Sequence, residues 1–387
     1  MNKIYYICSY SNPDIIHEQR YYPPSGATKI DSIIDSLSRL SKHIEIISVS
    51  MIHDNSNGNS HYVKLNDYVY LKLFKSYGRK NAVIKLGDRV QLYASFLWYF
   101  ITNIKKNDTV IVYHSLAYLK MIYLLKKIIG FKLILEVEEI YSDVLGKKNY
   151  RDKELGMMNI ADGYIYPSYE LEKICNRRKK PYVVIHGTYD AEKEIIKCKK
   201  RNKEYIHIVY AGTLDIRKGC METIKAAALL SDKYRVSILG TDKPSNMESI
   251  IELIDEVNKK GAGQVELFGK RTGKDYIEFL QSCDIGMCTQ DPDAEFTETS
   301  FPSKILSYLS NGLRVVSIDI PAVKNSDVAD VIYFYNEQTP KAIAECIKSI
   351  DLNSAYNSKD KIMKLKRDFI ANMENMLMEV EKGQLYD

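Results

Sequence analysis

A glycine turn that ends on a lysine is the first group of residues whose types and spacing could do chemistry. Residues 209–219 read VYAGTLDIRKG, which predicts a buried strand, a turn at Gly212 and a Lys218-Gly219 step that opens a helix. A helix start offers unpaired backbone N–H groups and a positive dipole end, so a phosphate fits beside the Lys218 charge. A plain turn with a solvated Arg217-Lys218 pair explains the same residues, and the dinucleotide fingerprint GxGxxG is absent.

A second segment of this character follows in the same half of the chain. Residues 301–317 read FPSKILSYLSNGLRVVS, in which Pro302 suits the first turn of a helix and Gly312 its end. The Ser303 and Lys304 amides would point out of the helix start, with the Lys304 side chain beside them. Both turns would lie at the carboxyl ends of parallel strands, where open α/β sheets bind ligands. Two anion-favouring turns in one domain predict a diphosphate rather than a single phosphate.

Carboxylates and a histidine form a third candidate group, in the first half of the chain. Glu136 and Glu138 close the strand-like run LILEVEE, and alternation places them on one side of that strand. One of them could deprotonate an acceptor hydroxyl or bind sugar hydroxyls, and an ion pair with a neighbouring lysine or arginine is the structural alternative. His114 ends the run VIVYH at the carboxyl end of another strand, where a catalytic and a structural role are both open.

These residues need a scaffold, and the hydrophobic pattern predicts one. Strand-like runs alternate with helical patterns along the chain, which is typical of parallel α/β architecture. The expected strands are 3–9, 44–50, 109–113, 132–137, 163–166, 182–186, 205–211, 234–239, 264–268, 285–288 and 314–318. The expected helices are 29–40, 116–129, 169–176, 218–231, 246–260, 274–282 and 303–311, while 63–77 could be strand or helix.

Length and charge divide this scaffold into two Rossmann-like domains. The 387 residues suffice for two domains of ~100–200 residues each. Residues 1–187 carry 27 Lys/Arg and 18 Asp/Glu, whereas residues 188–387 carry 28 and 32. The charged run 193–204 lacks apolar periodicity and indicates a linker. We expect an N-terminal domain at 1–190 and a C-terminal domain at 191–359. A last helix, 360–387, has an apolar stripe at Ile362, Leu365, Phe369, Met373, Met376 and Val380 and is grouped with the N-terminal domain.

The cysteines and the N-terminus predict a cytoplasmic protein. The seven cysteines are odd in number and none forms a CxxC pair, which favours reduced thiols over disulfides or a zinc site. No hydrophobic signal core precedes the first strand. The most apolar window, 93–104, is shorter than the ~20 residues that span a bilayer.

Basic and aromatic residues are interleaved in the first half. The cations are Lys72, Lys75, Arg79, Lys80, Lys85 and Arg89, and the aromatic residues are Tyr68, Tyr70, Phe74 and Tyr77. Nucleic-acid binding would use such a mixture, but no RNA-binding or DNA-binding module is recognisable, so no nucleic-acid partner is expected. Anionic lipid headgroups fit better, which predicts a peripheral position at the inner face of the cell membrane. A solvated charged surface is the alternative.

Several of these segments resemble retaining glycosyltransferases of the family-four type, which have the GT-B fold. The resemblance lies mainly in VYAGTLDIRKG…AAALL and FPSKILSYLSNGLRVVS, with support from VELFGKRTGKDYIEFLQSCDIGM, YYPPSGATKIDSIIDSLSRL, LILEVEEIYSD and PYVVIHGTY. It is strongest to members from bacterial capsule, exopolysaccharide and lipopolysaccharide clusters. It implies an α/β protein with two Rossmann-like domains facing across a cleft and a C-terminal helix that crosses back toward the N-domain.

The resemblance also implies roles for individual residues. Such enzymes bind a nucleoside-diphosphate sugar without a metal or other cofactor and transfer a hexosyl unit with retention of configuration. Lys218 matches their phosphate lysine, which would stabilise the charge that develops on the diphosphate. The other donor-side positions implied are Gly212, Thr213, Arg217, Gly269, Lys270, Arg271, Thr272, Ser303, Lys304 and Ser307. Gly26, in a predicted first β–α loop, would approach the sugar and the diphosphate, and a plain turn is the alternative there.

Three positions depart from the family pattern. Thr213 stands where an arginine is common, and Thr299 and Ser307 stand where two glutamates are common. Glu298, Glu295, Asp293 and Asp291 lie just upstream and could substitute, or could form a solvated acidic loop. We expect a metal-independent hexosyltransferase with Lys218, Glu138, Glu298 and His114 as catalytic candidates, acting on a glycan or lipid-linked glycan. A UDP-sugar 2-epimerase-like enzyme and a catalytically silent partner subunit are the alternatives.

Overall fold

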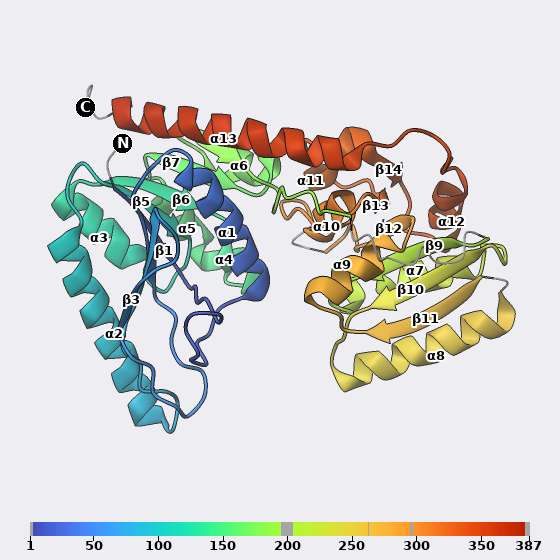
Figure 1. Ribbon diagram of the computed structural model, residues 1–387, viewed down its shortest axis with the longest axis horizontal. Coiled ribbons are helices and arrows are strands. Elements are labelled where there is room, and N and C mark those ends of the chain that lie inside the picture. The colour runs from blue at the N-terminus through green and yellow to red at the C-terminus, as the bar shows by residue number, and fades with distance from the viewer. Residues whose placement is uncertain (1–2, 195–203, 262, 295–296, 384–387) are drawn as a thin grey trace. The chain divides into compact units, whose positions relative to one another are not determined.

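The structure is a computed structural model and describes residues 3–194, 204–261, 263–294 and 297–383. The described chain forms two compact units, shown in Figure 1. Unit 1 comprises the residues up to Pro167, Leu171–Ile185 and the chain from Asp368 onward. Unit 2 comprises Ser168–Glu170 and His186–Arg367. Most of the expected linker 193–204 lies outside the described residues.

Unit 1 is built on an eight-stranded sheet in the order β3-β4-β2-β1-β5-β6-β7-β8. All neighbouring strands are parallel except β3 and β4, which are antiparallel. The strands are β1 (Ile4–Cys8), β2 (Ile44–Ser48), β3 (His61–Lys64), β4 (Val69–Leu73), β5 (Thr109–Tyr113), β6 (Lys132–Glu136), β7 (Gly163–Tyr166) and β8 (Tyr182–Val184). The central strands are buried on both faces, which explains their nearly continuous apolar sequence.

Helices cover the unit 1 sheet. They are α1 (Pro24–Ser38), α2 (Ala82–Asn103), α3 (Leu119–Ile129), α4 (Tyr141–Val144), α5 (Arg151–Met158) and the part of α6 (Tyr169–Cys175) from Leu171 on. One core holds side chains from α2, α3 and α5, including Phe96, Ile122 and Leu155. The last helix, α13 (Ser358–Lys382), contributes its residues from Asp368 on, and its Val380 packs against Gly163 of β7. All six apolar residues of the stripe expected on this helix are buried.

Unit 2 repeats the plan with a six-stranded, wholly parallel sheet in the order β11-β10-β9-β12-β13-β14. The strands are β9 (Ile206–Ala211), β10 (Tyr234–Leu239), β11 (Gln264–Gly269), β12 (Ile285–Cys288), β13 (Arg314–Ile318) and β14 (Ile332–Tyr335). The helices are α7 (Cys220–Ala227), α8 (Pro244–Lys260), α9 (Gly273–Gln281), α10 (Lys304–Ser310), α11 (Pro321–Lys324) and α12 (Pro340–Lys348).

The strand order reverses once in each sheet, between β1 and β5 in unit 1 and between β9 and β12 in unit 2. Such a switch point opens a crevice at the carboxyl ends of the strands, and this is where ligands bind in doubly wound folds. The predicted fold class, an α/β protein with two parallel sheets, is confirmed. The ambiguous run 63–77 contains the end of β3 and all of β4.

Two sequence expectations on elements need correction. Gly26 does not lie in a β–α loop, because α1 begins at Pro24 and holds Gly26 in its first turn. Proline suits this position since it has a helical φ and no N–H to leave unpaired. Helix α2 was not among the expected elements, because its apolar residues do not keep to one face and therefore hide the helical period.

Candidate functional site

Three glycines bring together the loops that follow β9, β10 and β11. Gly212, Gly240 and Gly269 stand at the carboxyl ends of these strands. The Gly212 N–H donates to Leu239 O (3.0 Å), and the Gly240 N–H donates to Gly269 O (2.9 Å). Gly240 has a φ of 143°, and a Cβ atom there would lie 1.9 Å from Gly212 O. A side chain at Gly240 would therefore push these two loops apart.

A fourth glycine joins the turn after β9 to the strand on the other side of the switch point. Gly219 has a φ of 80°, and a Cβ atom there would lie 1.5 Å from Thr289 O. The Thr289 hydroxyl donates to Gly219 O (2.6 Å). Thr289 directly follows β12, so the turn 212–219 is fixed at the switch point of unit 2.

Tyr210 organises two lysines at this point. Its hydroxyl donates to Lys218 O (2.8 Å), and its ring lies 3.6 Å from Lys304 Nζ, which is a cation–π contact. Gly212 leaves room for the same ammonium, because a Cβ atom there would lie 3.5 Å from Lys304 Cε and Nζ. The two predicted turns are thus brought together by a tyrosine that the sequence patterns did not single out. The run VYAG gave no sign that this tyrosine ring would face a cation.

The Lys304 ammonium has no counter-ion within the described part of the chain. Its Nζ is buried and has no hydrogen-bond partner among the residues that the structure describes. Burial lowers the pKa of Lys304 to about 8; the neighbouring Cys288 thiol opposes this shift, and the Lys218 charge adds to it. A buried cation without a partner is costly, and a second positive charge beside it adds to the cost. An anion bound between these lysines would relieve both effects.

Helix α10 is held so that Lys304 stays at the switch point. Tyr308 on this helix is fully buried, and its hydroxyl accepts a hydrogen bond from the Ala211 N–H (2.8 Å) at the end of β9. The Tyr308 ring packs on the backbone of Gly286 in β12, where a Cβ atom would lie 2.3 Å from Tyr308 Cγ. The seven residues of α10 form a short helix, so the site rests on the Lys304 side chain more than on helix-end amides.

Other donor-side candidates have partners of their own. The Arg217 guanidinium forms an ion pair with Asp215 (2.7 Å). The Ser307 hydroxyl hydrogen-bonds the Tyr276 hydroxyl (3.1 Å), and Thr213 is exposed. Ser303 is exposed at the start of α10. Lys270, Arg271 and Thr272 are exposed between β11 and α9, and Arg271 lies over the Phe279 ring.

The acidic loop after β12 lies next to the turn at Arg217. The Asp291 N–H donates to Arg217 O (3.0 Å), and the Thr297 hydroxyl donates to Asp291 O (2.8 Å). Glu298 is exposed in this loop, and the Thr299 carbonyl accepts a hydrogen bond from Ser168. Glu295 lies outside the described residues.

In unit 1, carboxylates gather near the carboxyl ends of β1 and β6. The Tyr6 hydroxyl donates to Glu136 Oε2, and Lys29 of α1 forms an ion pair with Glu138. Burial, followed by the charge of Glu138, raises the pKa of Glu136 to about 7. Glu136 Oε1 is buried without a hydrogen-bond partner in the described chain, whereas the Glu138 side chain is 24% exposed. Of these groups, Glu138 is accessible to an acceptor.

His114 is fully buried and has a structural partner. Its Nε2 lies 2.7 Å from Glu154 Oε1, and the same carboxylate accepts the N–H groups of Tyr141 and Ser142 at the start of α4. Burial opposes ionisation, but the hydrogen bonds from His114 and Ser142 lower the pKa of Glu154. The side chain of His114 has no exposed surface with which to touch an acceptor.

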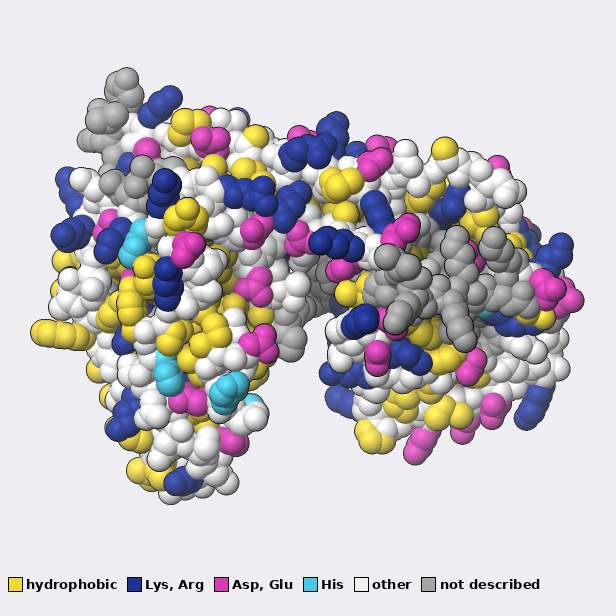
Figure 2. Space-filling model, viewed as in Figure 1, with side chains coloured by type: hydrophobic (Ala, Val, Ile, Leu, Met, Phe, Trp, Pro, Cys, Tyr) yellow, Lys and Arg dark blue, Asp and Glu magenta, His cyan; other side chains and the backbone are white. Residues whose placement is uncertain are grey.

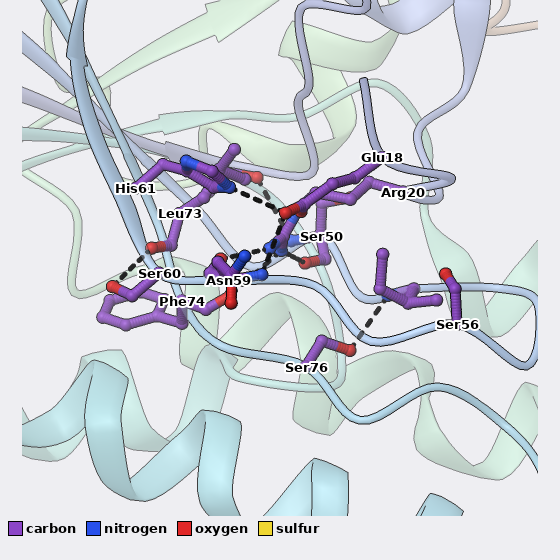
Figure 3. A network of polar contacts seen from close by, with 12 residues as sticks. Glu18, Arg20, Ser50, Ser56, Asn59, Ser60, His61, Leu73, Phe74 and Ser76 are labelled. Carbon is purple, nitrogen blue, oxygen red and sulfur yellow. Dashed lines mark hydrogen bonds and ion pairs between the residues drawn. The ribbon is translucent and has the colours of Figure 1, made fainter. Parts of the chain in front are cut away.

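A buried arginine, which sequence reasoning did not single out, shapes the loop after β1. Figure 3 shows Arg20 at the centre of a polar network between this loop and segments next to β2, β3 and β4. Its guanidinium donates to Ser50 O (3.0 Å), Phe74 O (3.0 Å) and Asn59 O (2.6 Å), and it pairs with Glu18 (2.8 Å). His61 of β3 also contacts Glu18 (2.8 Å). The loop between β1 and α1 is therefore held by a charged side chain that uses four of its five N–H donors.

A cavity of about 530 Å³ in unit 2 lies apart from these groups. It is lined by residues at the amino ends of β9, β10 and β11, among them His207, Arg235 and Gln264. The switch-point lysines stand at the opposite, carboxyl ends. The described residues contain no group of three or more His, Cys, Asp or Glu side chains placed to hold a metal ion. None of the helices in the described segments has the length and apolar character needed to cross a membrane.

Comparisons with known proteins agree with this architecture. Residues 205–351, most of unit 2, match the profile of a family described as glycosyl transferases group 1. No curated protein sequence matches the chain.

Solved structures resemble the chain over nearly its full length. An alpha,alpha-trehalose 6-phosphate synthase from Burkholderia multivorans has a TM-score of 0.70 at 9% identity, covering 100% of this chain and 97% of that one. A trehalose-6-phosphate structure from E. coli, bound with UDP-2-fluoro glucose, has a TM-score of 0.70 at 10% identity, with coverages of 98% and 99%. HepE from Anabaena, in complex with UDP and glucose, has a TM-score of 0.63 at 12% identity, with coverages of 99% and 100%. This likeness shows the GT-B fold.

Proposed function

We propose that the protein is a glycosyltransferase whose unit 2 binds a nucleoside-diphosphate sugar at the switch point between β9 and β12. The observation that carries this proposal is the buried Lys304 ammonium beside Lys218, for which the described residues supply no hydrogen-bond partner or counter-ion. The positive charge of Lys218 adds to the cost of burying Lys304 at a ligand-binding edge, and a diphosphate bound there would supply Lys304 with a partner and offset this repulsion. The family match over residues 205–351 supports the same activity for this unit.

The proposed donor is a UDP-sugar. Two of the similar structures were obtained with UDP-2-fluoro glucose or with UDP and glucose, which supports uridine for a chain with this fold. Gly269 has a φ of 68° and ends β11 beside the other two glycine loops, so its backbone is open to a planar base. The transferred unit is proposed to be a hexosyl group.

The two lysines would act during bond cleavage. As the bond between the anomeric carbon and the diphosphate breaks, its electron pair passes to the leaving oxygen, and negative charge grows there. Lys218 and Lys304 would stabilise that charge, and fixed charges in a desolvated site are effective in this role. An acceptor hydroxyl would form the new bond on the same face, and its proton would pass to the leaving diphosphate, which gives retention. Two lysines in this role make a divalent cation unnecessary, and metal independence is part of the proposal.

The proposed acceptor is a hydroxyl of a surface glycan of the capsule or lipopolysaccharide type, carried on a lipid. Glu138 supports this assignment because it is a partly exposed carboxylate just after β6 and is oriented by Lys29. Carboxylates paired in this way accept hydrogen bonds from sugar hydroxyls. The protein would then act in the cytoplasm.

Donor binding and hydrolysis test this proposal. We expect UDP-sugars to bind more tightly than GDP-, dTDP- or CMP-sugars in calorimetry, and the best binder to be hydrolysed slowly in the presence of EDTA. Lys218→Ala should lower kcat by at least about a hundredfold, the scale of one electrostatic donor at a transition state. Wild-type turnover in Lys218→Ala, or an absolute need for a metal ion, would contradict the mechanism.

A catalytically silent partner subunit is the second candidate. It is favoured by Arg217, which is paired with Asp215, and by Ser307, which is hydrogen-bonded to Tyr276. UDP binding without hydrolysis or transfer would identify this function. Isomerisation of the donor without an acceptor would instead indicate an epimerase.

A further inference from the structure

Helix α2 is apolar on two opposite faces. Its inner face carries Leu92, Phe96 and Phe100, which are buried in the unit 1 core. Its outer face carries an exposed stripe with spacings of three and four residues, formed by Val83, Leu86, Val90, Ala94, Leu97 and Ile101. A surface helix of a globular protein normally has a polar outer face. In α2 the apolar stripe runs from Val83 to Ile101 within a helix of 22 residues, a length of roughly 28 Å at ~1.5 Å per residue.

One further exposed side chain makes the stripe wider. Trp98 is 74% exposed beside the C-terminal half of the stripe, and Val83 is 79% exposed at its beginning. Helix α3, which packs into the same core as α2, adds Leu124 and Ile128 on its own exposed side. Figure 2 shows hydrophobic side chains projecting from the margin of unit 1 where Figure 1 places α2. Exposed apolar patches of this kind mark contact surfaces.

The charges around this surface have one sign. Between residues 79 and 135 the chain has two acidic residues, Asp88 and Asp108, and both are buried. Asp88 is used internally, since it accepts hydrogen bonds from the Ser76 hydroxyl and the Tyr77 N–H. The exposed cations of the same segment are Arg79, Lys80, Lys85, Arg89, Lys105, Lys106, Lys120 and Lys127. They precede, accompany and follow the two helices.

We propose that the exposed face of α2 and α3 docks on the surface of an anionic lipid bilayer. Apolar and aromatic side chains would enter the headgroup region while lysines and arginines contact lipid phosphates, the combination that holds amphipathic helices at an interface. A second copy of this chain is a poor match, since the same eight cations would face each other without an exposed acid. The aromatic residues of 68–77, which the sequence predicted to contact the membrane, are less suited to this role than α2, because Phe74 is buried and the Tyr70 ring stacks on Tyr62.

The protein carries its own reporter for this surface. Trp98 is the single tryptophan of the 387 residues and stands on the proposed face. Its fluorescence in the full-length protein should shift to shorter wavelength with phosphatidylglycerol vesicles and shift little with phosphatidylcholine vesicles. Brominated lipid should quench it, and raised ionic strength should weaken the effect. No donor or acceptor is needed, so the result is independent of the proposed glycosyl transfer.

Variants distinguish vesicle binding through α2 from nonspecific binding of the protein to lipid. Val90→Glu combined with Leu97→Glu should lower partitioning into phosphatidylglycerol vesicles by at least about tenfold, because both lose apolar burial. Lys105→Glu combined with Lys106→Glu should have a similar effect, at ~1 kcal/mol per cation near the membrane. Ile251→Glu, at an exposed apolar position on α8, is the matched control and should bind as the wild type does.

Several results would overturn the proposal. They are a wild-type protein that does not bind anionic vesicles, equal binding of the α2 variant and the control, and a Trp98 shift that depends on protein concentration without lipid. The last result would assign the face to a second copy of the chain. Thermal unfolding of each variant verifies that the fold is intact.

Discussion

Replacing Lys304 by methionine should stabilise the empty protein and abolish diphosphate binding. The difference between an ordinary lysine pKa of 10.5 and about 8 corresponds to about 3 kcal/mol of unfavourable burial, at ~1.36 kcal/mol per pKa unit. The cation–π contact between the Tyr210 ring and Lys304 Nζ offsets up to ~2 kcal/mol of this burial cost. Methionine has a similar length and no charge, so we expect Lys304→Met to raise the free energy of unfolding by about 1–2 kcal/mol at pH 7.

The pH dependence has a definite sign. Below about pH 8 the lysine is protonated in both the folded and the unfolded protein, so its burial cost is complete there. Between about pH 8 and 10.5 the folded protein binds fewer protons at Lys304 than the unfolded chain, so stability rises with pH. This rise should be missing in Lys304→Met. UDP should bind more weakly above about pH 8, by up to about tenfold per pH unit, as the ammonium is lost.

Urea unfolding and calorimetry measure both effects. Titrations with UDP near pH 8, in buffers of different ionisation enthalpy, should show uptake of about half a proton, which Lys304→Met should lack. Lys233→Met, at an exposed lysine of unit 2, is the matched control and should change neither quantity. Unchanged UDP affinity in Lys304→Met, or a loss of stability in the absence of ligand, would refute the role assigned to the buried ammonium.

Three further predictions follow from buried groups. The pKa of Glu136 is raised from 4.5 to about 7, so its contribution to stability is present below pH 4.5 and is lost as the pH rises to about 7. In urea unfolding at pH 8, Glu136→Gln should therefore be more stable than the wild type by up to about 3 kcal/mol. Equal stability of the two proteins at pH 8 would argue against this burial cost. Gly219→Ala should lower the free energy of unfolding by more than about 3 kcal/mol, because Gly219 has a φ of 80° and a Cβ atom there would clash with Thr289 O. Gly146→Ala is the control, since Gly146 also has a positive φ but a Cβ atom there meets no atom within 4 Å. Equal losses of stability in the two variants would mean that the close approach to Thr289 does not matter. Arg20→Met should cost about 3–5 kcal/mol, because Glu18 loses its ion pair and three carbonyls lose their donor. Thermal unfolding would reveal this loss, and a fully stable variant would disprove it.

Much of the scaffold could be predicted from the sequence. The strands 109–113, 163–166, 234–239, 285–288 and 314–318 have the bounds that their apolar runs predicted, because buried parallel strands need such runs. The turns at Gly212 and Gly312 were recognisable from glycine beside an apolar run. Both glycines have positive φ, at 146° and 85°. Helix α2 was missed because an exposed apolar face conceals the period on which its recognition depends.

Individual side chains at the site were less predictable. Lys218 and Lys304 stood out by type and position, but their common neighbour Tyr210 lies on a strand where any apolar residue would satisfy the pattern. Lys29 was expected only to begin a helix, and its pairing with Glu138 joins residues 109 positions apart. His114 could be placed at the end of a strand, yet its burial against Glu154 depends on where the chain returns forty residues later.

The sequence by itself determined the alternation of strands and helices and the glycines at sharp turns, because these follow from local periodicity and backbone sterics. It also placed Lys218 and Lys304 beside two of these turns. Only the tertiary structure decided that the Lys304 ammonium is buried on Tyr210 without a counter-ion among the described residues, that His114 is buried against Glu154, and that the outer face of α2 is uncovered. Burial and pairing depend on which distant segments meet. The free energy of a charge depends on those neighbours more than on its place in the chain.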